Sequence, residues 1–163
     1  MPQAAAKNTF LIHDHQRCAT RAMKLVTAAC ADHGLRLTEV RQRVMEILLE
    51  QHRALGAYDI LERLKTEGFG SQPPVVYRAL DFLVMHGFAH RLERLNAFMA
   101  CAHPGPDHQA MFLICEGCNH VAEASLEGLK VPIRGACTEL GFKMNTAAVE
   151  ILGTCPECRG GEG

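Results

Sequence analysis

The chain of 163 residues contains no tryptophan, and aromatic residues make up only 6% of it. Proteins that bind sugars or single-stranded nucleic acid commonly stack them on aromatic side chains, so this shortage argues against both classes. No apolar run approaches the length needed to cross a bilayer. Residues 1–10 also lack the charged-then-apolar pattern of a secretory leader. We therefore expect a cytoplasmic protein that has no membrane partner.

A strong net charge is also missing, since the formal value at pH 7 is −1. The two parts of the chain nevertheless differ in sign. Residues 1–100 hold 13 of the 17 lysines and arginines against 10 of the 18 acids, whereas residues 101–163 hold the other 4 against 8. This distribution indicates a basic module joined to an acidic one, and a basic module is compatible with nucleic-acid binding.

Cysteine, in contrast, is plentiful, with eight copies. Four of them form two Cys-x-x-Cys pairs, Cys115 with Cys118 and Cys155 with Cys158. Four thiolates delivered as two knuckles suit a tetrahedral zinc ion. Disulfides would need an oxidising compartment, and a thioredoxin-like redox site uses a single pair in a βαβ setting. The 36 residues between the pairs predict a structural zinc that joins the two ends of a small subdomain.

A zinc hydrolase or nucleobase deaminase is the alternative that these motifs raise. Deaminases carry His-x-Glu followed by Pro-Cys-x-x-Cys. Here Pro156 lies inside the second pair, and His120 precedes Glu123 by three positions rather than two. A catalytic zinc also keeps an open coordination position, which a four-cysteine site lacks. We therefore expect no enzymatic activity and no small organic substrate.

The basic half has the periodicity of a helix-turn-helix domain. Apolar residues recur there with helical spacing, and glycines interrupt the segments where helices should end. A proline pair begins the last segment, where a missing backbone N–H costs nothing. The expected helices run from about His15 to Asp32, from the N-cap Thr38 onward, from Ala57 to Gly68 and from Pro73 to Gly87, with a turn at Gly70 to Gln72 between the last two.

Two short β-prone runs follow, Phe88 to Leu92 and Ala97 to Cys101, and they predict a hairpin around Leu95-Asn96. Helices arranged in this order with a terminal hairpin form a winged helix, whose third core helix enters the major groove of DNA. The inward-facing positions of that helix leave Tyr77, Arg78 and Asp81 on its outer side. The Arg78 guanidinium matches a guanine edge or a phosphate, although a solvated helix charge would show the same pattern.

Tyr58 lies near the start of the preceding helix, where helix N-termini of such domains approach the DNA backbone. A partly buried packing residue would fit this position equally well. The residues alone leave both roles of Tyr58 open.

Together these motifs resemble the ferric uptake regulator (Fur) family of bacterial metal-sensing repressors. The resemblance covers the chain from Leu35 to Cys158. It rests on four segments in matching order and spacing, Leu37-Thr38-x-x-Arg41, Pro73-Pro74-Val75-Val76-Tyr77-Arg78-Ala79-Leu80, Phe112-Leu113-Ile114-Cys115-x-x-Cys118 and Cys155-x-x-Cys158. Three further segments look most like the zinc uptake regulator (Zur) branch, namely Leu55-Gly56-Ala57-Tyr58-Asp59-Ile60-Leu61, Arg78-Ala79-Leu80-Asp81-Phe82-Leu83 and Leu95-Asn96-Ala97-Phe98.

The resemblance implies an α+β protein with an N-terminal winged helix-turn-helix domain and a small C-terminal α/β dimerisation domain that carries the four-cysteine zinc site. The implied boundaries are 1–101 for the DNA-binding domain, 102–110 for a hinge and 111–163 for the dimerisation domain. It also implies a homodimer on palindromic double-stranded DNA. Tyr58 and Arg78 match DNA-contacting positions of relatives, and we expect Tyr77 to contact DNA beside them.

A second, regulatory zinc site is implied by the same resemblance. Its ligands would be His90, Cys101, His108 and Glu123, with His103 as the alternative to His108. Each ligand taken singly also fits a plainer role, such as a small buried cysteine or a surface acid. The thiolate favours zinc over metals that prefer oxygen and nitrogen ligands, although iron, manganese, nickel or peroxide sensing would keep the same fold. The expected function is repression of zinc-uptake genes with zinc as corepressor.

Overall fold

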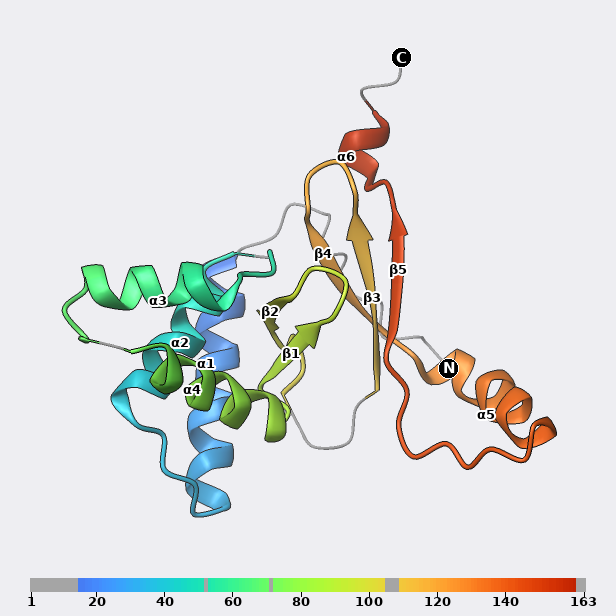
Figure 1. The fold of residues 1–163 in the computed structure, drawn as a ribbon, viewed down its shortest axis with the longest axis horizontal. Coiled ribbons are helices and arrows are strands. Elements are labelled where there is room, and N and C mark those ends of the chain that lie inside the picture. The colour runs from blue at the N-terminus through green and yellow to red at the C-terminus, as the bar shows by residue number, and fades with distance from the viewer. Residues whose placement is uncertain (1–14, 52, 71, 105–108, 161–163) are drawn as a thin grey trace. The chain divides into compact units, whose positions relative to one another are not determined.

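The computed structural model describes residues 15–51, 53–70, 72–104 and 109–160 (Figure 1). These residues divide into two units, 15–104 and 109–160. In this part of the chain, no helix is both long enough and apolar enough to cross a membrane. The elements of the first unit are α1 (His15–Asp32), α2 (Glu39–Leu49), α3 (Ala57–Thr66), α4 (Pro73–Met85), β1 (Ala89–Leu92) and β2 (Ala97–Ala100).

A helical core forms the centre of the first unit. Helix α2 begins after Thr38, the predicted N-cap, whose hydroxyl accepts a hydrogen bond from the backbone N–H of Arg41 at 3.3 Å. Each helix turns one apolar face inward, as its spacing predicts. The largest side chains that are shielded from solvent in this core are Val26, Val44, Met45, Ile47, Leu48, Ile60, Leu64, Val76, Leu80 and Leu83.

Helices α3 and α4 form the predicted helix-turn-helix. Gly68 and Gly70 have φ values of +84° and +56°, a conformation that costs glycine little. Pro73 and Pro74 occupy the first positions of α4, where the absence of an N–H removes no helical hydrogen bond. The buried face of α4 leaves its opposite face exposed, including Arg78.

An ion-pair cluster connects α2 with the end of α3. The Arg43 guanidinium donates two hydrogen bonds of 2.6 Å to the Glu67 carboxylate and also reaches Glu46 and Glu50. Glu50 in turn pairs with Arg63. The hydrogen bond from Arg43 lowers the pKa of Glu67, and the bond to Glu67 raises the pKa of Arg43. Such exposed pairs add little stability.

Helix α4 ends before Gly87, as predicted, but the strand that follows begins one residue later than predicted. Gly87 has a φ of +71° and donates to the Val84 carbonyl at 3.1 Å, while the N–H of Phe88 donates to the Leu83 carbonyl at 2.8 Å. This pair of bonds is a Schellman motif. Phe88 therefore closes the helix, and the first strand of the wing begins at Ala89 rather than at Phe88.

The wing is an antiparallel hairpin in which Ala89 pairs with Ala100 and Leu92 with Ala97. The second strand ends at Ala100, one residue earlier than predicted. The N–H of Cys101 still donates to the carbonyl of Phe88 at 2.9 Å, so the backbone pairing continues past the strand. This bond fixes Cys101 beside the base of the wing.

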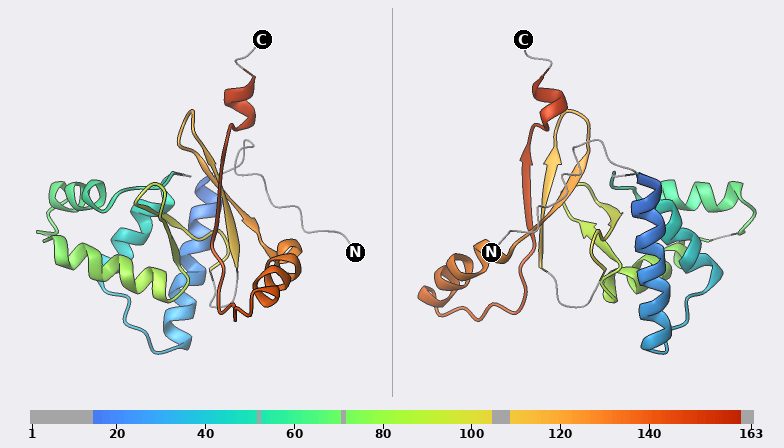
Figure 2. Two further views of the ribbon diagram at one scale, coloured as in Figure 1. Left: turned by 45° about the vertical axis from the view of Figure 1, so that its right-hand side comes forward. Right: turned by 180° about the vertical axis from the view of Figure 1, so that it is seen from behind.

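The second unit contains a three-stranded sheet. Its elements are β3 (Ala110–Cys115), β4 (Val121–Ser125), η1 (Glu127–Leu129), α5 (Lys130–Glu139), β5 (Val149–Gly153) and α6 (Pro156–Arg159). The strand order is β4-β3-β5, with β3 antiparallel to β4 and parallel to β5. Figure 2 shows β5 beside β3 from two sides, with α6 beyond its end. The predicted α+β class, with the helical domain first and the α/β domain second, is confirmed.

Candidate metal centres and nucleic-acid interface

The cysteines of the two Cys-x-x-Cys pairs lie together at one end of the sheet, and we call them the four-cysteine cluster. Cys115 is the last residue of β3, and Cys118 follows in the turn toward β4. Cys155 is the N-cap of α6, and Cys158 lies within that helix. The parallel register puts Cys115 opposite Gly153, so the segment after β5 reaches the first pair directly.

The spacing of the sulfur atoms fits a tetrahedral metal ion. All four Sγ atoms lie within 4.8 Å of one another, and those of Cys118 and Cys155 are 3.7 Å apart. At a Zn–S distance of about 2.3 Å, the sulfurs of a regular tetrahedron would be about 3.8 Å apart. All four are free thiols rather than disulfides. The four-cysteine cluster can therefore hold a zinc ion.

The backbone of the knuckles is also arranged around the sulfurs. The N–H of Cys155 donates to Cys115 Sγ at 3.3 Å, and the N–H of Cys158 donates to Cys155 Sγ at 3.5 Å. Such bonds stabilise the thiolate, which is the form that binds metal. A Cβ atom at Gly117 would lie 3.1 Å from Cys158 Sγ, so a glycine keeps this approach open. Asn119 adopts a φ of +57°, a conformation that asparagine tolerates.

These contacts move the pKa values of the thiols in opposite directions. Backbone hydrogen bonds, above all the one from Cys155, lower the pKa of Cys115 to about 6. Side-chain hydrogen bonding, first with Cys155, raises the pKa of Cys158 to about 12. Neighbouring thiolates repel one another, so the four groups cannot all ionise without a cation. A bound dication would compensate for this repulsion.

Zinc binding to the metal-free protein is expected to release protons at pH 7. Cys158 is protonated there, and the pKa of Cys118 is raised as well, although zinc binds both as thiolates. We expect about two or more protons released per ion, and hence a zinc affinity that rises about 100-fold or more per pH unit near neutrality. Calorimetry in buffers of different ionisation enthalpy measures the proton count. An affinity that does not change with pH would contradict this assignment.

The first unit brings together two of the residues expected in the regulatory site. His90 lies on β1 opposite Met99, and Cys101 follows β2. A ring nitrogen of His90 and the Sγ of Cys101 lie within 4.8 Å of each other. Cys101 is only 1% exposed, and its sulfur accepts a hydrogen bond from the N–H of His103 at 3.3 Å. This pair offers one nitrogen and one thiolate, a donor set that suits zinc.

The other expected ligands are placed differently. Glu123 belongs to the second unit, where it lies on β4 opposite Phe112 and is half-buried. His103 has an exposed side chain in the first unit. His108 lies outside the described residues, as do its neighbours 105–107. The complete ligand set and the hinge boundaries of 102–110 therefore stay predictions.

The residues expected to contact DNA are exposed on α3 and α4. Tyr58, the second residue of α3, is 70% exposed, which argues against the packing role that the sequence left open. Tyr77 is 44% exposed, and Arg78 follows it on the outer face of α4. The buried face of α4, formed by Val76 and Leu80 among others, fixes this orientation. An exposed recognition helix in this setting can enter a major groove.

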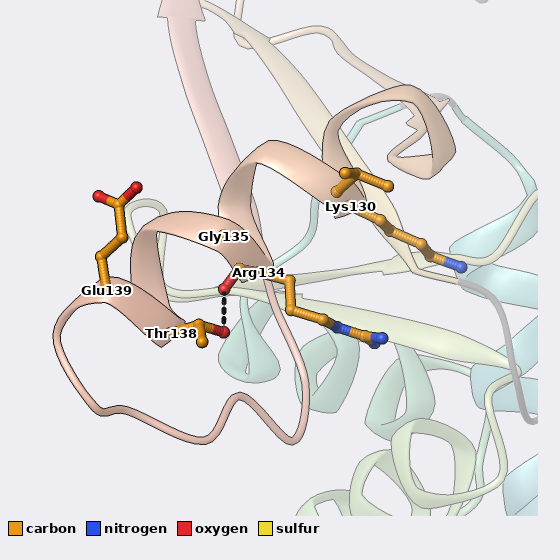
Figure 3. Close-up of a pocket in the computed structure, with 6 residues that line it drawn as sticks. Lys130, Arg134, Gly135, Thr138 and Glu139 are labelled. Carbon is orange, nitrogen blue, oxygen red and sulfur yellow. Dashed lines mark hydrogen bonds between the residues drawn. The ribbon is translucent and has the colours of Figure 1, made fainter.

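A surface hollow of about 700 Å³ lies beside α5 (Figure 3). In this view Lys130 and Arg134 extend their charged ends to the same side of the helix, while Glu139 points away from them. Thr138 donates a hydrogen bond to the Arg134 carbonyl at 2.9 Å. Among the described residues that line the hollow there is no cysteine or histidine, so none of the metal-ligand candidates named above belongs to them.

Sequence reasoning missed the backbone part of these sites. The backbone N–H of Cys155 donates to the Cys115 sulfur, and the backbone N–H of His103 donates to the Cys101 sulfur. Cys155 and His103 are candidate metal ligands through their side chains, and nothing in the sequence indicates these backbone hydrogen bonds. One signal was available for Gly117, since a glycine directly before the second cysteine of a knuckle often marks a close backbone approach.

Comparison with known proteins agrees with this geometry. The model of the ferric uptake regulator family matches residues 32–152. The zinc uptake regulation protein of Escherichia coli strain K12 is 35% identical over 130 residues, which cover 79% of this chain and 76% of that protein. A zinc uptake regulator complexed with zinc and DNA is similar with a TM-score of 0.80 and 32% identity, over 93% of this chain and 99% of that one. Holo XcZur is similar with a TM-score of 0.78 and 35% identity, over 85% and 96% respectively.

Proposed function

The chain belongs to the ferric uptake regulator family, and we infer that it is a zinc-responsive transcriptional repressor. It is a regulator of transcription and not an enzyme. The observation that carries this inference is the similarity, over nearly the whole chain, to a zinc uptake regulator bound to zinc and DNA. An exposed recognition helix on a winged helix and a four-cysteine cluster with zinc spacing support it. We place its action in the cytoplasm, on genes for zinc uptake.

Two zinc sites with different roles are proposed. The four-cysteine cluster holds a structural zinc that stabilises the second unit. His90 and Cys101 belong to the regulatory site, together with Glu123 and either His108 or His103. A zinc ion bound there would supply a crosslink between ligands of the two units. The thiolate of Cys101 favours zinc over harder metals, so this residue sets the identity of the effector.

On DNA the protein is proposed to act as a homodimer that reads a palindrome. The α4 helix of each copy enters a major groove, where Arg78 and Tyr77 face the bases and Tyr58 approaches the backbone. Half-sites lie one helical turn or a multiple apart, so binding requires one separation of the two winged units. The metal-free protein samples several separations, and ligation selects one. Such coupling is typically about 1–3 kcal/mol, or about 5- to 150-fold in affinity.

Replacement of Cys101 by alanine tests this function. We expect Cys101→Ala to bind DNA in zinc about 5- to 150-fold more weakly than the unaltered protein, at the level of the zinc-free state. The reason is that the regulatory site loses its only thiolate, while the structural zinc is retained. The measurement is binding to palindromic duplexes that the zinc-loaded protein has selected from a random library, with and without added zinc.

Cys30→Ala is the matched control, because Cys30 is also a buried cysteine of the first unit but lies on α1. It should keep the full zinc response. Thermal unfolding of both variants shows whether the fold is intact. An undiminished zinc response in Cys101→Ala would remove Cys101 from the site, and DNA binding that ignores zinc in the unaltered protein would refute the proposed function itself.

A further inference from the structure

The tip of the recognition helix is apolar. Helix α4 starts with Pro73, Pro74 and Val75, and Val75 is 38% exposed although its side chain is a branched hydrocarbon. From this feature we propose that Val75 recognises the C5-methyl group of a thymine in the major groove of the operator. The proposal rests on the proposed DNA-binding function and assigns a specificity residue to it.

The backbone of this tip has no donors left for a phosphate. Helix N-termini commonly bind phosphates through their free N–H groups. In α4 the two prolines carry no N–H, and the N–H groups of Val75 and Val76 both donate to the Gln72 carbonyl, at 2.9 and 3.3 Å. The first four residues of the helix therefore have no unused backbone donor. What the tip can offer to DNA is van der Waals contact.

The position of Val75 beside Arg78 directs that contact toward the bases. Residues three apart on a helix are surface neighbours and are separated by about 4.5 Å along the axis, close to the 3.4 Å between successive bases of a strand. The burial of Val76 and Ala79 holds this part of the helix in one orientation. When Arg78 reaches a base edge, Val75 lies over an adjacent base pair.

Thymine is the base whose edge fits such a side chain. Its C5-methyl is the apolar group that base pairs present in the major groove, where the other edges offer hydrogen-bond donors and acceptors. Valine is also stiff at χ1 in a helix, so little side-chain freedom is lost when the contact forms. A valine at this position therefore favours thymine over a base that lacks the methyl group.

Replacement of thymine by uracil tests the proposal, because uracil lacks only that methyl group. Duplexes selected by the zinc-loaded protein from a random library are resynthesised with one symmetric pair of thymines at a time changed to uracil. At one position the unaltered protein should bind about fourfold more weakly per half-site, or about 15-fold for both, since one buried methyl group is lost in each. Val75→Ala should show a clearly smaller uracil penalty at that position, because its side chain is shorter by two methyl groups.

Two further variants make the result specific. Val75→Thr keeps one methyl group and should retain most of the uracil penalty, whereas Met85→Ala removes a 77% exposed apolar side chain at the other end of the same helix and should leave the penalty unchanged. Equal uracil penalties in Val75→Ala and the unaltered protein would overturn the proposal. So would a loss of affinity in Val75→Ala that is the same on thymine and uracil duplexes, which would indicate a contact to the sugar-phosphate backbone. If zinc-loaded protein selects no sequence at all, the proposed function fails; selection without any uracil effect refutes only the role of Val75.

Discussion

Replacement of Cys155 by serine is expected to unfold the second unit and to remove one zinc ion per chain. Structural zinc in small domains contributes roughly 10–16 kcal/mol of apparent binding free energy, which is folding free energy when no site exists in the unfolded chain. A single domain has about 5–15 kcal/mol of net stability. Loss of the zinc-binding free energy would therefore remove most or all of the folding free energy of the second unit. Zinc content by elemental analysis and limited proteolysis of residues 109–160 measure the result.

Serine separates the metal from the other role of Cys155. This residue is the N-cap of α6, and its side chain accepts the N–H of Cys158. Serine is a good N-cap, so Cys155→Ser keeps that bond and loses chiefly the thiolate. Cys137→Ser, on α5 and outside the four-cysteine cluster, is the matched control and should keep its zinc. A Cys155→Ser protein with full zinc content and a protected second unit would contradict the structural role.

Replacement of Arg78 by alanine is expected to reduce specific DNA binding by about 30-fold to 10⁴-fold. A good bidentate contact to a base is worth about 1–3 kcal/mol, and a dimer on a palindrome loses two of them. The side chain is exposed on α4, so the fold should be unaffected. Binding to selected palindromic duplexes and to unrelated duplexes, each at several salt concentrations, measures the loss.

The salt series distinguishes a base contact from a phosphate contact. Loss of a base contact lowers affinity for the selected sequence more than for unrelated DNA, whereas loss of a phosphate contact weakens both and reduces the salt slope by about 1 per contact. Arg78→Lys keeps the charge without the planar fork and should fail to restore specificity. Arg134→Ala, an exposed arginine on α5, is the control. Specific binding that survives Arg78→Ala would exclude Arg78 from the interface.

Local signals in the sequence were sufficient for the winged helix. Three of these signals each act within a few residues and can be identified in the sequence itself. They are the Thr38 cap, the proline pair at the start of α4 and the glycine at its end. The start of the strand near Phe88 was harder to predict from the sequence. A Schellman bond from Phe88 to Leu83 competes with strand pairing, and the apolar pattern fits both.

Long-range geometry was harder to predict. The Cys-x-x-Cys spacing identified the four-cysteine cluster, but the parallel pairing of β3 with β5, which joins its halves, leaves no periodic trace in the chain. The closeness of His90 and Cys101 depends in the same way on the hairpin register. The roles of Glu123 and of His108 or His103 stay predictions. The local structure of one unit does not determine where ligands from the other unit lie.

The parallel pairing of β3 with β5 also affects how the protein is made. The chain between Cys118 and Cys155 must close a loop of 36 residues before the two knuckles meet, at an entropic cost of about 3 kcal/mol. Residues 15–104 precede Cys155 in the order of synthesis, so a ribosome completes the winged unit first. If the four-cysteine cluster holds a structural zinc, we expect the second unit to assemble once the last cysteine pair has emerged and bound that ion. We therefore expect zinc supply during translation to affect how quickly a newly made chain becomes an active repressor.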